Sequence, residues 1–226
     1  LPKPMLPVVG QPMLEHVVQH MRHHGIVDII ITTHYCPGPI VDHFGDGSRF
    51  GVKIRYAHES VLMETAGSIK LIETLLVEDF LVVGGNDLLP ALDISAFLRF
   101  HSERGGIGSI VFKQLDTEGL LRLFGQFGQG RIGPDQRLIE FQEKPDQRMS
   151  HFVHTTYQCY SPRVFDYIPP QTFYSIPRDL IPQLLSARER IYGYITESDF
   201  VCISTHVLYH HANEVMARIV TGNQND

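Results

Sequence analysis

Helix and strand patterns alternate along the first half of this chain, and the alternation restricts the fold more than any other feature. Between residues 13 and 24 the apolar side chains of Leu14, Val17 and Met21 recur at helical spacing. Residues 26–32 then form a short, nearly continuous β-branched run, which is typical of a strand buried on both faces. Because the two patterns repeat about every 25 residues, the sequence predicts an α/β protein with a mostly parallel central sheet flanked by helices.

The expected helices span residues 13–24, 40–44, 66–76, 94–101, 176–185 and 207–220. The expected strands span residues 26–32, 52–56, 80–83, 108–112, 138–142, 153–160, 191–195 and 200–203. The character of the chain changes after about residue 115, because three glycines between residues 120 and 130 separate short β-prone stretches. We therefore predict one domain over residues 1–226, with β-hairpins inserted at about 115–160 at one end of the sheet.

Composition excludes several classes of protein. With 226 residues, 43% hydrophobic and 19% charged, the chain has enough apolar material for one sizeable core and is too hydrophobic for a disordered protein. No apolar run approaches the roughly 20 residues that cross a bilayer, so no membrane partner is expected. The net charge of −6 argues against a general nucleic-acid binder, which carries a basic surface.

The cysteines and histidines argue against a structural disulfide or metal site. The three cysteines, Cys36, Cys159 and Cys202, are odd in number, widely spaced and without a CxxC pair. A disulfide scaffold or a zinc site is therefore not expected, and a reducing cytoplasm is the predicted compartment. The 13 histidines include no HExxH motif and no carboxylate-paired spacing, so we expect no histidine metal site.

Several segments occur in an order that is familiar from one enzyme family. They are residues 2–8, 10–17, 31–35, 44–52, 64–69, 124–125, 141–145 and 161–169. Together they resemble the sugar-1-phosphate nucleotidyltransferases, such as the mannose-1-phosphate guanylyltransferases, from residue 2 to about 215. The resemblance implies a nucleotide-diphospho-sugar transferase (GT-A-like) fold. It also implies a Mg²⁺-dependent reaction in which a nucleoside triphosphate (NTP) and a sugar 1-phosphate give a nucleotide sugar and pyrophosphate.

Two lysines stand where the family contacts phosphate groups. Lys3 lies between two prolines, which fix the backbone from which its side chain starts. Glu143 and Lys144 end a predicted strand, and the resemblance implies that Glu143 holds sugar hydroxyls while Lys144 meets the sugar phosphate. The alternatives are a solvated terminal lysine at position 3 and a surface ion pair at positions 143 and 144.

The segment Thr65, Ala66 and Gly67 opens a predicted helix, and the resemblance implies that it binds substrate. Small residues let a base or a phosphate approach the backbone, and the N-terminus of a helix favours negative charge. A simple N-cap at Thr65 explains the same residues. Glu64 stands where the family usually has a small residue, and we expect its carboxylate to point at the base or away from the site, since it would repel phosphate.

A metal ligand is expected after the buried strand at residues 80–83. A gapless alignment with the family's metal-binding Asp places Asn86 there, whereas one extra residue places Asp87 there, and we prefer Asp87. A hard carboxylate oxygen at the carboxyl end of a strand suits Mg²⁺. A simple turn at these residues is the alternative. Lys3, Asp87 and Lys144 are thus the expected catalytic residues.

The match to the family fails at three places. The family's glycine-rich signature loop is not in this sequence, so we expect upstream residues or another segment to supply the first strand. Cys202 stands where the family has a second metal-binding Asp, and a protonated thiol is a poor ligand for Mg²⁺. Thr155 and Thr156 replace smaller residues of the sugar-binding strand, so Thr156 would bind substrate in a narrower pocket. Gly125 matches a family glycine near the sugar, or is a hairpin glycine with positive φ.

Two functions remain open on these grounds, with a pure interaction domain as a third. The first is an active nucleotidyltransferase that takes an NTP and a sugar 1-phosphate. The second is a weak or inactive homologue that binds a nucleotide sugar or regulates a partner subunit, which the loss of a carboxylate at Cys202 favours. Either protein could form homo-oligomers.

Overall fold

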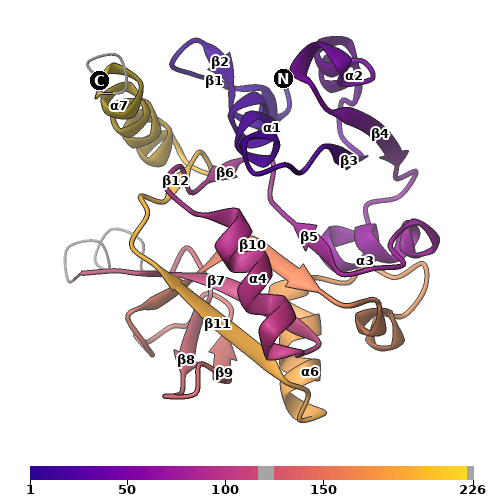
Figure 1. The fold of residues 1–226 in the computed structure, drawn as a ribbon, viewed down its shortest axis with the longest axis vertical. Helices are drawn as coiled ribbons and strands as arrows, with labels where there is room; N and C mark the ends of the chain where they lie inside the picture. Colours follow the sequence, from indigo (N-terminus) through magenta and orange to yellow (C-terminus); the bar gives the residue numbers. More distant parts are fainter. Residues whose placement is uncertain (117–124, 223–226) are drawn as a thin grey trace. The chain divides into compact units, whose positions relative to one another are not determined.

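A computed structural model describes residues 1–116 and 125–222, and the chain divides into two compact units. Unit 1 comprises Leu1–His58, Gly84–Ile94 and Ser198–Asp226. Unit 2 comprises Glu59–Val83 and Ser95–Glu197. Figure 1 shows the helices and strands of both units, coloured along the sequence. In the part of the chain that is described, no helix combines the length and apolar character needed to cross a bilayer.

A parallel pair of strands organises the first part of unit 1. Strands β3 (Asp28–Thr33) and β4 (Lys53–His58) pair in parallel and are joined through helix α2 (Gly38–Phe44) and the 3₁₀ turn η2 (Ser48–Phe50). The strands predicted at residues 26–32 and 52–56 are thereby confirmed. Strand β3 is half-buried rather than buried on both faces, because it has a single strand neighbour among the described residues.

The turn before β4 explains one segment of the family resemblance. The carboxylate of Asp46 accepts a hydrogen bond from the backbone N–H of Ser48 at 3.0 Å, and the pKa of Asp46 is lowered, chiefly by the Ser48 hydroxyl. Gly47 has φ = +84°, and a Cβ there would lie 2.8 Å from Cγ1 of Ile54. Residues 44–52 therefore close the crossover to β4, a structural role.

The rest of unit 1 assembles around a second, short pair of strands. Strand β6 (Asp87–Leu88) pairs antiparallel with β12 (Val201–Cys202). Helix α1 (Met13–His23) packs on β6, and helix α7 (His206–Gly222) packs on β12. The remaining elements are the turn η1 (Lys3–Met5) and the antiparallel strands β1 (Pro7–Val8) and β2 (Gln11–Pro12). The predicted helices at 13–24 and 207–220 are confirmed, whereas β1, β2 and β6 are too short for a periodic signal.

Unit 2 contains a six-stranded sheet (Figure 1). Its strands are β5 (Phe80–Val82), β7 (Gly108–Gln114), β8 (Gln129–Ile132), β9 (Leu138–Gln142), β10 (Phe152–Tyr160) and β11 (Ile191–Thr196). Strand β10 is central: β7 pairs along one edge, and β5 and β8 pair with the two ends of the other edge, all antiparallel. Because β11 is parallel to β7 and β9 is antiparallel to β8, strands β5, β7, β8 and β11 share one direction and β9 and β10 run the other way.

Helices cover both faces of this sheet, as expected for an α/β protein. Tyr192 and Tyr194 of β11 contact Phe100 of α4 (Ile94–Arg104). Ile191 points to the opposite face, because side chains alternate along a strand. There it joins a buried cluster with Leu184 of helix α6 (Ile181–Ser186). The predicted α/β class is confirmed, and the antiparallel pairs reflect the central place of β10.

Two predicted helices are interrupted in unit 2. The helix expected at 66–76 is α3 (Glu64–Leu71) followed by the turn η3 (Glu73–Leu75), and the one expected at 176–185 begins with a π-helical turn, η5 (Ile176–Leu180), before α6. A further 3₁₀ segment, η4, spans Pro162–Tyr167. Of the β-rich insertion expected at about 115–160, strands β8, β9 and β10 are observed, and residues 117–124 lie outside the described part.

Replacing Gly47 is expected to destabilise unit 1 more than replacing Gly25. Both glycines have positive φ, but a Cβ at Gly25 meets no atom within 4 Å. Gly25→Ala should lower the free energy of unfolding by about 1 kcal/mol through backbone strain, and Gly47→Ala by about 2–4 kcal/mol because a steric clash adds to the strain. Urea unfolding followed by circular dichroism measures both. Equal losses would contradict the close approach at Ile54.

Candidate functional site

In unit 1 a carboxylate and a thiol face each other across the β6–β12 pair. Asp87 and Cys202 are register partners, and their side chains are 3% and 3% exposed. Burial raises the pKa of the Cys202 thiol to about 12, and the charge of Asp87 and a hydrogen bond to its carboxylate add to the rise. The hydroxyl of Ser204 lies 3.1 Å from the sulfur. The thiol is therefore protonated at neutral pH.

Lys3 lies near the same strand end. The turn η1 begins after Pro2 and includes Pro4, and the exposed side chain of Lys3 donates from Nζ to the carbonyl oxygen of Ser204 at 3.4 Å. A lysine whose neighbours are both prolines leaves the backbone in a defined direction. Lys3, Ser204, Cys202 and Asp87 therefore form one group of polar side chains in unit 1, which we name the β6–β12 group.

The β6–β12 group offers Mg²⁺ one carboxylate. No cluster of three or more His, Cys, Asp or Glu side chains that could hold a metal occurs among the described residues. The protonated thiol of Cys202 is too soft for Mg²⁺, so Asp87 is the hard ligand of the group. Magnesium in nucleotide-binding enzymes commonly takes one or two carboxylates and completes its shell with phosphates and water. The residues present fit such a site only if the substrate supplies further oxygen ligands.

In unit 2 the predicted sugar-phosphate pair lies at the end of β9. Glu143 is half-buried, and one of its carboxylate oxygens lies 2.8 Å from where a Cβ on Gly128 would be, so this glycine lets the carboxylate approach the backbone. Lys144 is exposed and has φ = +47°, a backbone conformation that residues other than glycine rarely adopt. The pair thus combines a sheltered acceptor with an accessible cation.

The first turn of α3 is already hydrogen-bonded to another segment of unit 2. The carbonyl oxygen of Tyr174 accepts from the N–H groups of Ala66 and Gly67 at 2.8 and 3.0 Å. A Cβ on Gly67 would lie 2.5 Å from the carbonyl oxygen of Thr172. Glycine at position 67 therefore permits this close contact, and a phosphate at these N–H groups would compete with Tyr174.

The N-cap explanation of Thr65 is wrong. Helix α3 begins at Glu64, so Thr65 lies inside the first turn, and its hydroxyl accepts from the backbone N–H of Ile176 at 2.8 Å. The side chain that supports the start of α3 is Glu59, which accepts from the N–H of Met63 at 3.0 Å and from the Ser68 hydroxyl at 2.6 Å. Sequence analysis missed Glu59, because it precedes the helix without an apolar pattern to mark it.

The side chain of Glu64 is directed toward Arg178. Its carboxylate pairs with the guanidinium of Arg178 at 3.1 Å, and Glu64 has φ = +61°. Arg178 belongs to η5 and also lies 5.7 Å from the centre of the Phe173 ring. Burial raises the pKa of Glu143, while Lys144 and Arg178 lower it and Glu64 raises it. Glu64, Glu143, Lys144 and Arg178 therefore share one electrostatic environment, which we name the β9–α3 cluster.

Strand β10 has a gap on the edge that carries β5 and β8. Two extra residues enter β10 between His154 and Gln158, where its register against β7 shifts. On the other edge, β8 pairs with residues 152–153, the N–H of His154 donates to the carbonyl oxygen of Gly128 at 2.8 Å, and β5 pairs with residues 158–160. Thr155 and Thr156 therefore lie outside the register of both strands. The hydroxyl of Thr156 is buried at this gap without a hydrogen-bond partner in the described part of the chain. Such bulges redirect side chains next to binding sites.

Gly125, the remaining predicted site residue, is exposed and has φ = +72°. A Cβ there would meet no atom within 4 Å. The backbone conformation therefore accounts for glycine at this position without a ligand.

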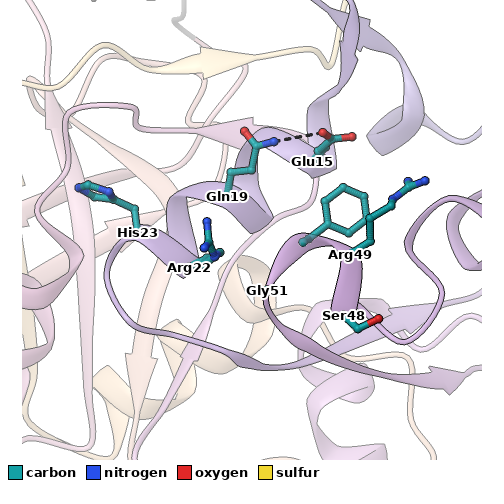
Figure 2. A pocket seen from close by; sticks show the side chains of 8 residues that line it. Glu15, Gln19, Arg22, His23, Ser48, Arg49 and Gly51 are labelled. Atoms are coloured by element: carbon teal, nitrogen blue, oxygen red, sulfur yellow. Dashed lines mark hydrogen bonds between the residues drawn. The ribbon is translucent and has the colours of Figure 1, made fainter.

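A shallow cavity in unit 1 holds none of the predicted site residues. It has a volume of about 690 Å³ and is lined by α1 and η2, with Glu15, Gln19, Arg22 and Arg49 among its walls (Figure 2). Gln19 donates to Glu15, and Arg49 donates to the carbonyl oxygen of His43. The side chains of Gln19 and Arg49 thus already have hydrogen-bond partners within the protein. We assign the cavity no role in the chemistry.

The predicted site residues therefore fall into separate groups. Lys3 and Asp87 meet in the β6–β12 group of unit 1. In unit 2, the charge of Glu64 at the start of α3 acts on Glu143, and Thr65, Ala66 and Gly67 follow Glu64 in the same helix. Sequence analysis missed Arg178, although a lone basic residue between Pro177 and Asp179, at the start of a predicted helix, was a usable signal.

Nearly the whole chain is similar to known proteins. A family model for nucleotidyl transferases matches residues 1–213. The chain is 29% identical over 216 residues to a UTP–glucose-1-phosphate uridylyltransferase from Synechocystis, covering 90% of this chain and 55% of that protein. It is 32% identical over 199 residues to a mannose-1-phosphate guanylyltransferase from Mycobacterium tuberculosis, covering 87% of this chain and 54% of that protein. The chain spans about half the length of these curated relatives.

A solved structure shows the same fold. The structure of a UDP-glucose pyrophosphorylase complexed with UDP-glucose matches with a TM-score of 0.78 and 16% identity, covering 96% of this chain and 91% of that chain. At this identity the likeness establishes the fold alone, which is the GT-A-like fold that the sequence predicted.

Protonation of His154 is expected to destabilise the protein in mild acid. Burial lowers the pKa of His154 from 6.5 to about 4, so the unfolded chain binds the proton more tightly and stability falls as the pH drops from about 6.5 towards 4. The ring contacts Phe141, and its Nε2 has no hydrogen-bond partner in the described part of the chain. The free energy of unfolding, measured with urea, should fall between pH 6.5 and pH 4.5 in both the wild type and His154→Phe. The fall should be about 1–3 kcal/mol smaller in His154→Phe than in the wild type. The matched variant His210→Asn, at an exposed position, should follow the wild type. Equal losses in His154→Phe and the wild type would contradict a neutral buried imidazole.

The Cys202 thiol is expected to react faster once Asp87 is neutral. Because the carboxylate contributes to the raised thiol pKa, Asp87→Asn should increase the thiolate fraction and raise the alkylation rate of Cys202 at pH 9 by about fivefold. Peptide mass spectrometry measures the rate, with exposed Cys36 as the internal reference. An unchanged rate at Cys202 would show that Asp87 does not act on the thiol.

Proposed function

Because the chain belongs to the nucleotidyl transferase family, we propose that it takes part in forming a nucleotide sugar and pyrophosphate from an NTP and a sugar 1-phosphate. The observation that carries the proposal is the β9–α3 cluster. A half-buried carboxylate at Glu143 stands beside an exposed ammonium at Lys144, and Arg178 lies within electrostatic reach. A carboxylate that accepts hydrogen bonds from sugar hydroxyls, next to cations that bind phosphate, suits a phosphosugar.

The roles in unit 2 follow from the chemistry of each side chain. Glu143 would accept hydrogen bonds from sugar hydroxyls, and Lys144 would neutralise the sugar phosphate. The unpaired hydroxyl of Thr156 in the β10 gap would serve a further sugar hydroxyl. Thr65, Ala66 and Gly67 would shape the substrate site through their close contact with residues 172–176, and Gly125 would lie near the sugar by family resemblance.

The β6–β12 group is the proposed partner of the triphosphate. Lys3 would contact phosphate oxygens, and Asp87 would hold Mg²⁺. The position of Asp87 opposite Cys202 supports Asp87 over Asn86, because Cys202 matches the family's second metal-binding position. When bound, Mg²⁺ would neutralise charge on the phosphates during displacement of pyrophosphate.

The protein's contribution to this reaction is positioning and charge. An oxygen of the sugar phosphate forms a bond to the α-phosphorus of the NTP, and the bond from that phosphorus to the bridging oxygen of pyrophosphate breaks. No protein atom is bonded covalently to either substrate. Lys3 and Lys144 would reduce the repulsion between two polyanions, which is the main barrier to bringing them together.

One observation favours a second function. The protonated thiol of Cys202 leaves Asp87 as the sole carboxylate of the β6–β12 group. A weak or inactive homologue, which binds a nucleotide sugar or regulates a partner subunit, would tolerate such a change. Homo-oligomerisation is compatible with either function. The three free cysteines support the cytoplasm as the proposed compartment.

The direct test is pyrophosphate release by the full-length protein with Mg²⁺ and pairs of common NTPs and sugar 1-phosphates. We expect turnover with at least one pair. Lys144→Ala should lower kcat/KM about a hundredfold, because a cation near the transferred charge is lost. Lys53→Ala, at an exposed lysine of β4, is the matched control and should retain activity. Absence of pyrophosphate with every pair would refute the enzyme and favour the second function.

The role of position 202 has a test of its own. Cys202→Asp should raise the affinity for Mg²⁺ in the presence of NTP about tenfold, because a second carboxylate joins Asp87. Isothermal titration measures the affinity, and Cys202→Ser controls for loss of the thiol. If the Asp and Ser variants bind Mg²⁺ equally, position 202 does not belong to a metal site.

A further inference from the structure

The backbone at Glu64 is in a conformation that glycine normally occupies. Its φ of +61° lies in the left-handed region, where the Cβ of an L-residue is crowded against the backbone. Glu64 is also the first residue of α3, so the strained position fixes where its side chain leaves the helix. A residue kept in such a conformation needs a compensating interaction.

The carboxylate of Glu64 forms an ion pair with Arg178. The carboxylate and the guanidinium are 3.1 Å apart, and the side chains are 31% and 51% exposed. The neighbouring acid Asp179 is directed elsewhere, since its carboxylate accepts from the backbone N–H of Ser175 at 2.7 Å. Glu64 is therefore the acidic side chain that occupies the guanidinium of Arg178.

Arg178 is presented by an irregular helical turn. It lies in the π-helical η5, after Pro177 and before Pro182 of α6. Proline has no N–H to donate, and π-helical turns are frequent at functional sites. The ring of Phe173 lies 5.7 Å from the guanidinium carbon and supports the same orientation. The guanidinium is thus held at the surface by a carboxylate and a ring.

The charges of the β9–α3 cluster cancel while Glu64 is present. Lys144 and Arg178 are cations, and Glu64 and Glu143 are carboxylates. Arg178 pairs with Glu64 at 3.1 Å, and the other three charges act on the pKa of Glu143. Replacing Glu64 by a neutral residue would leave a net charge of +1 beside the accessible Lys144. A cluster that is expected to receive a phosphate therefore carries its own competing anion.

We propose that Glu64 is an internal competitor for phosphate: its carboxylate occupies the anion-binding face of Arg178, and an incoming phosphate displaces it. The ligand class is a sugar phosphate, and this choice rests on the proposed function. Inorganic phosphate offers only its charge and competes poorly with Glu64. A sugar 1-phosphate brings hydroxyls for Glu143 as well, and this additional binding energy drives the exchange. Glu64 thereby selects for the complete substrate.

The test compares binding of inorganic phosphate and of glucose 1-phosphate by isothermal titration. Glu64→Gln removes the charge at constant size, and we expect it to raise the affinity for inorganic phosphate about threefold to tenfold. Glu64→Gly also removes the strain at φ = +61° and should bind at least as tightly. Glu140→Gln is the matched control, because Glu140 also forms an exposed ion pair in unit 2, with Arg131 at 3.2 Å.

A double substitution shows whether Arg178 is the group in question. Arg178→Gln should weaken phosphate binding. Glu64→Gln should increase the phosphate affinity less in the Arg178→Gln protein than in the wild type. Circular dichroism of each variant confirms that the fold is retained.

The outcomes separate this inference from the proposed function. A gain of phosphate affinity in Glu64→Gln that depends on Arg178 supports the inference even if no pyrophosphate is released with any substrate pair. Equal affinities in the wild type, Glu64→Gln and Glu140→Gln would overturn it, as would the lack of measurable phosphate binding in Glu64→Gln. Either of these two results leaves an observed nucleotidyltransferase activity unaffected.

Discussion

The pairing of β10 with three other strands is the constraint on which unit 2 depends. Strand β7 pairs with residues 152–154 and 158–160 on one edge of β10, while β8 and β5 pair with the two ends of the other edge. The two extra residues between His154 and Gln158 therefore interrupt the pairing with β7 in the same stretch that separates β8 from β5. Regular pairing along both edges would leave no such gap, and Thr156 would meet a neighbouring strand. The irregularity in the sheet accompanies the buried hydroxyl of Thr156, which has no hydrogen-bond partner among the described residues and is proposed to bind a sugar hydroxyl.

In both units, a group that could bind a charged ligand is neutral or already paired. In unit 1, burial and, to a lesser degree, Asp87 raise the pKa of the Cys202 thiol, so a position that matches a metal ligand behaves as a neutral side chain. In unit 2, Glu64 neutralises Arg178, so a cation suited to phosphate is already paired. Both features reduce the attraction for small anions and cations. They are consistent with a protein that responds to large substrates with several contacts, or with one whose activity has weakened.

The sequence predicted most of the longer helices and strands, because the apolar pattern of a segment indicates which of its faces is buried. Strand β9 at Leu138–Gln142 was predicted with its observed bounds. Strand β12 was predicted within residues 200–203, whereas its partner β6 was not, since two residues carry no period. The β9–α3 cluster was half predicted: Glu143 and Lys144 follow from the family resemblance, whereas Arg178 depends on a π-helical turn over 100 residues from Glu64. The strain at Glu64 is likewise a property of the folded backbone.

We propose that the β9–α3 cluster receives the phosphate of a sugar 1-phosphate in exchange for Glu64. A crystal structure of the protein with glucose 1-phosphate or mannose 1-phosphate would show whether this exchange occurs. We expect phosphate oxygens in hydrogen-bond contact with Lys144 and Arg178, sugar hydroxyls at Glu143, and the carboxylate of Glu64 turned away from the guanidinium. A bound sugar phosphate elsewhere, with the 3.1 Å ion pair between Glu64 and Arg178 intact, would contradict it.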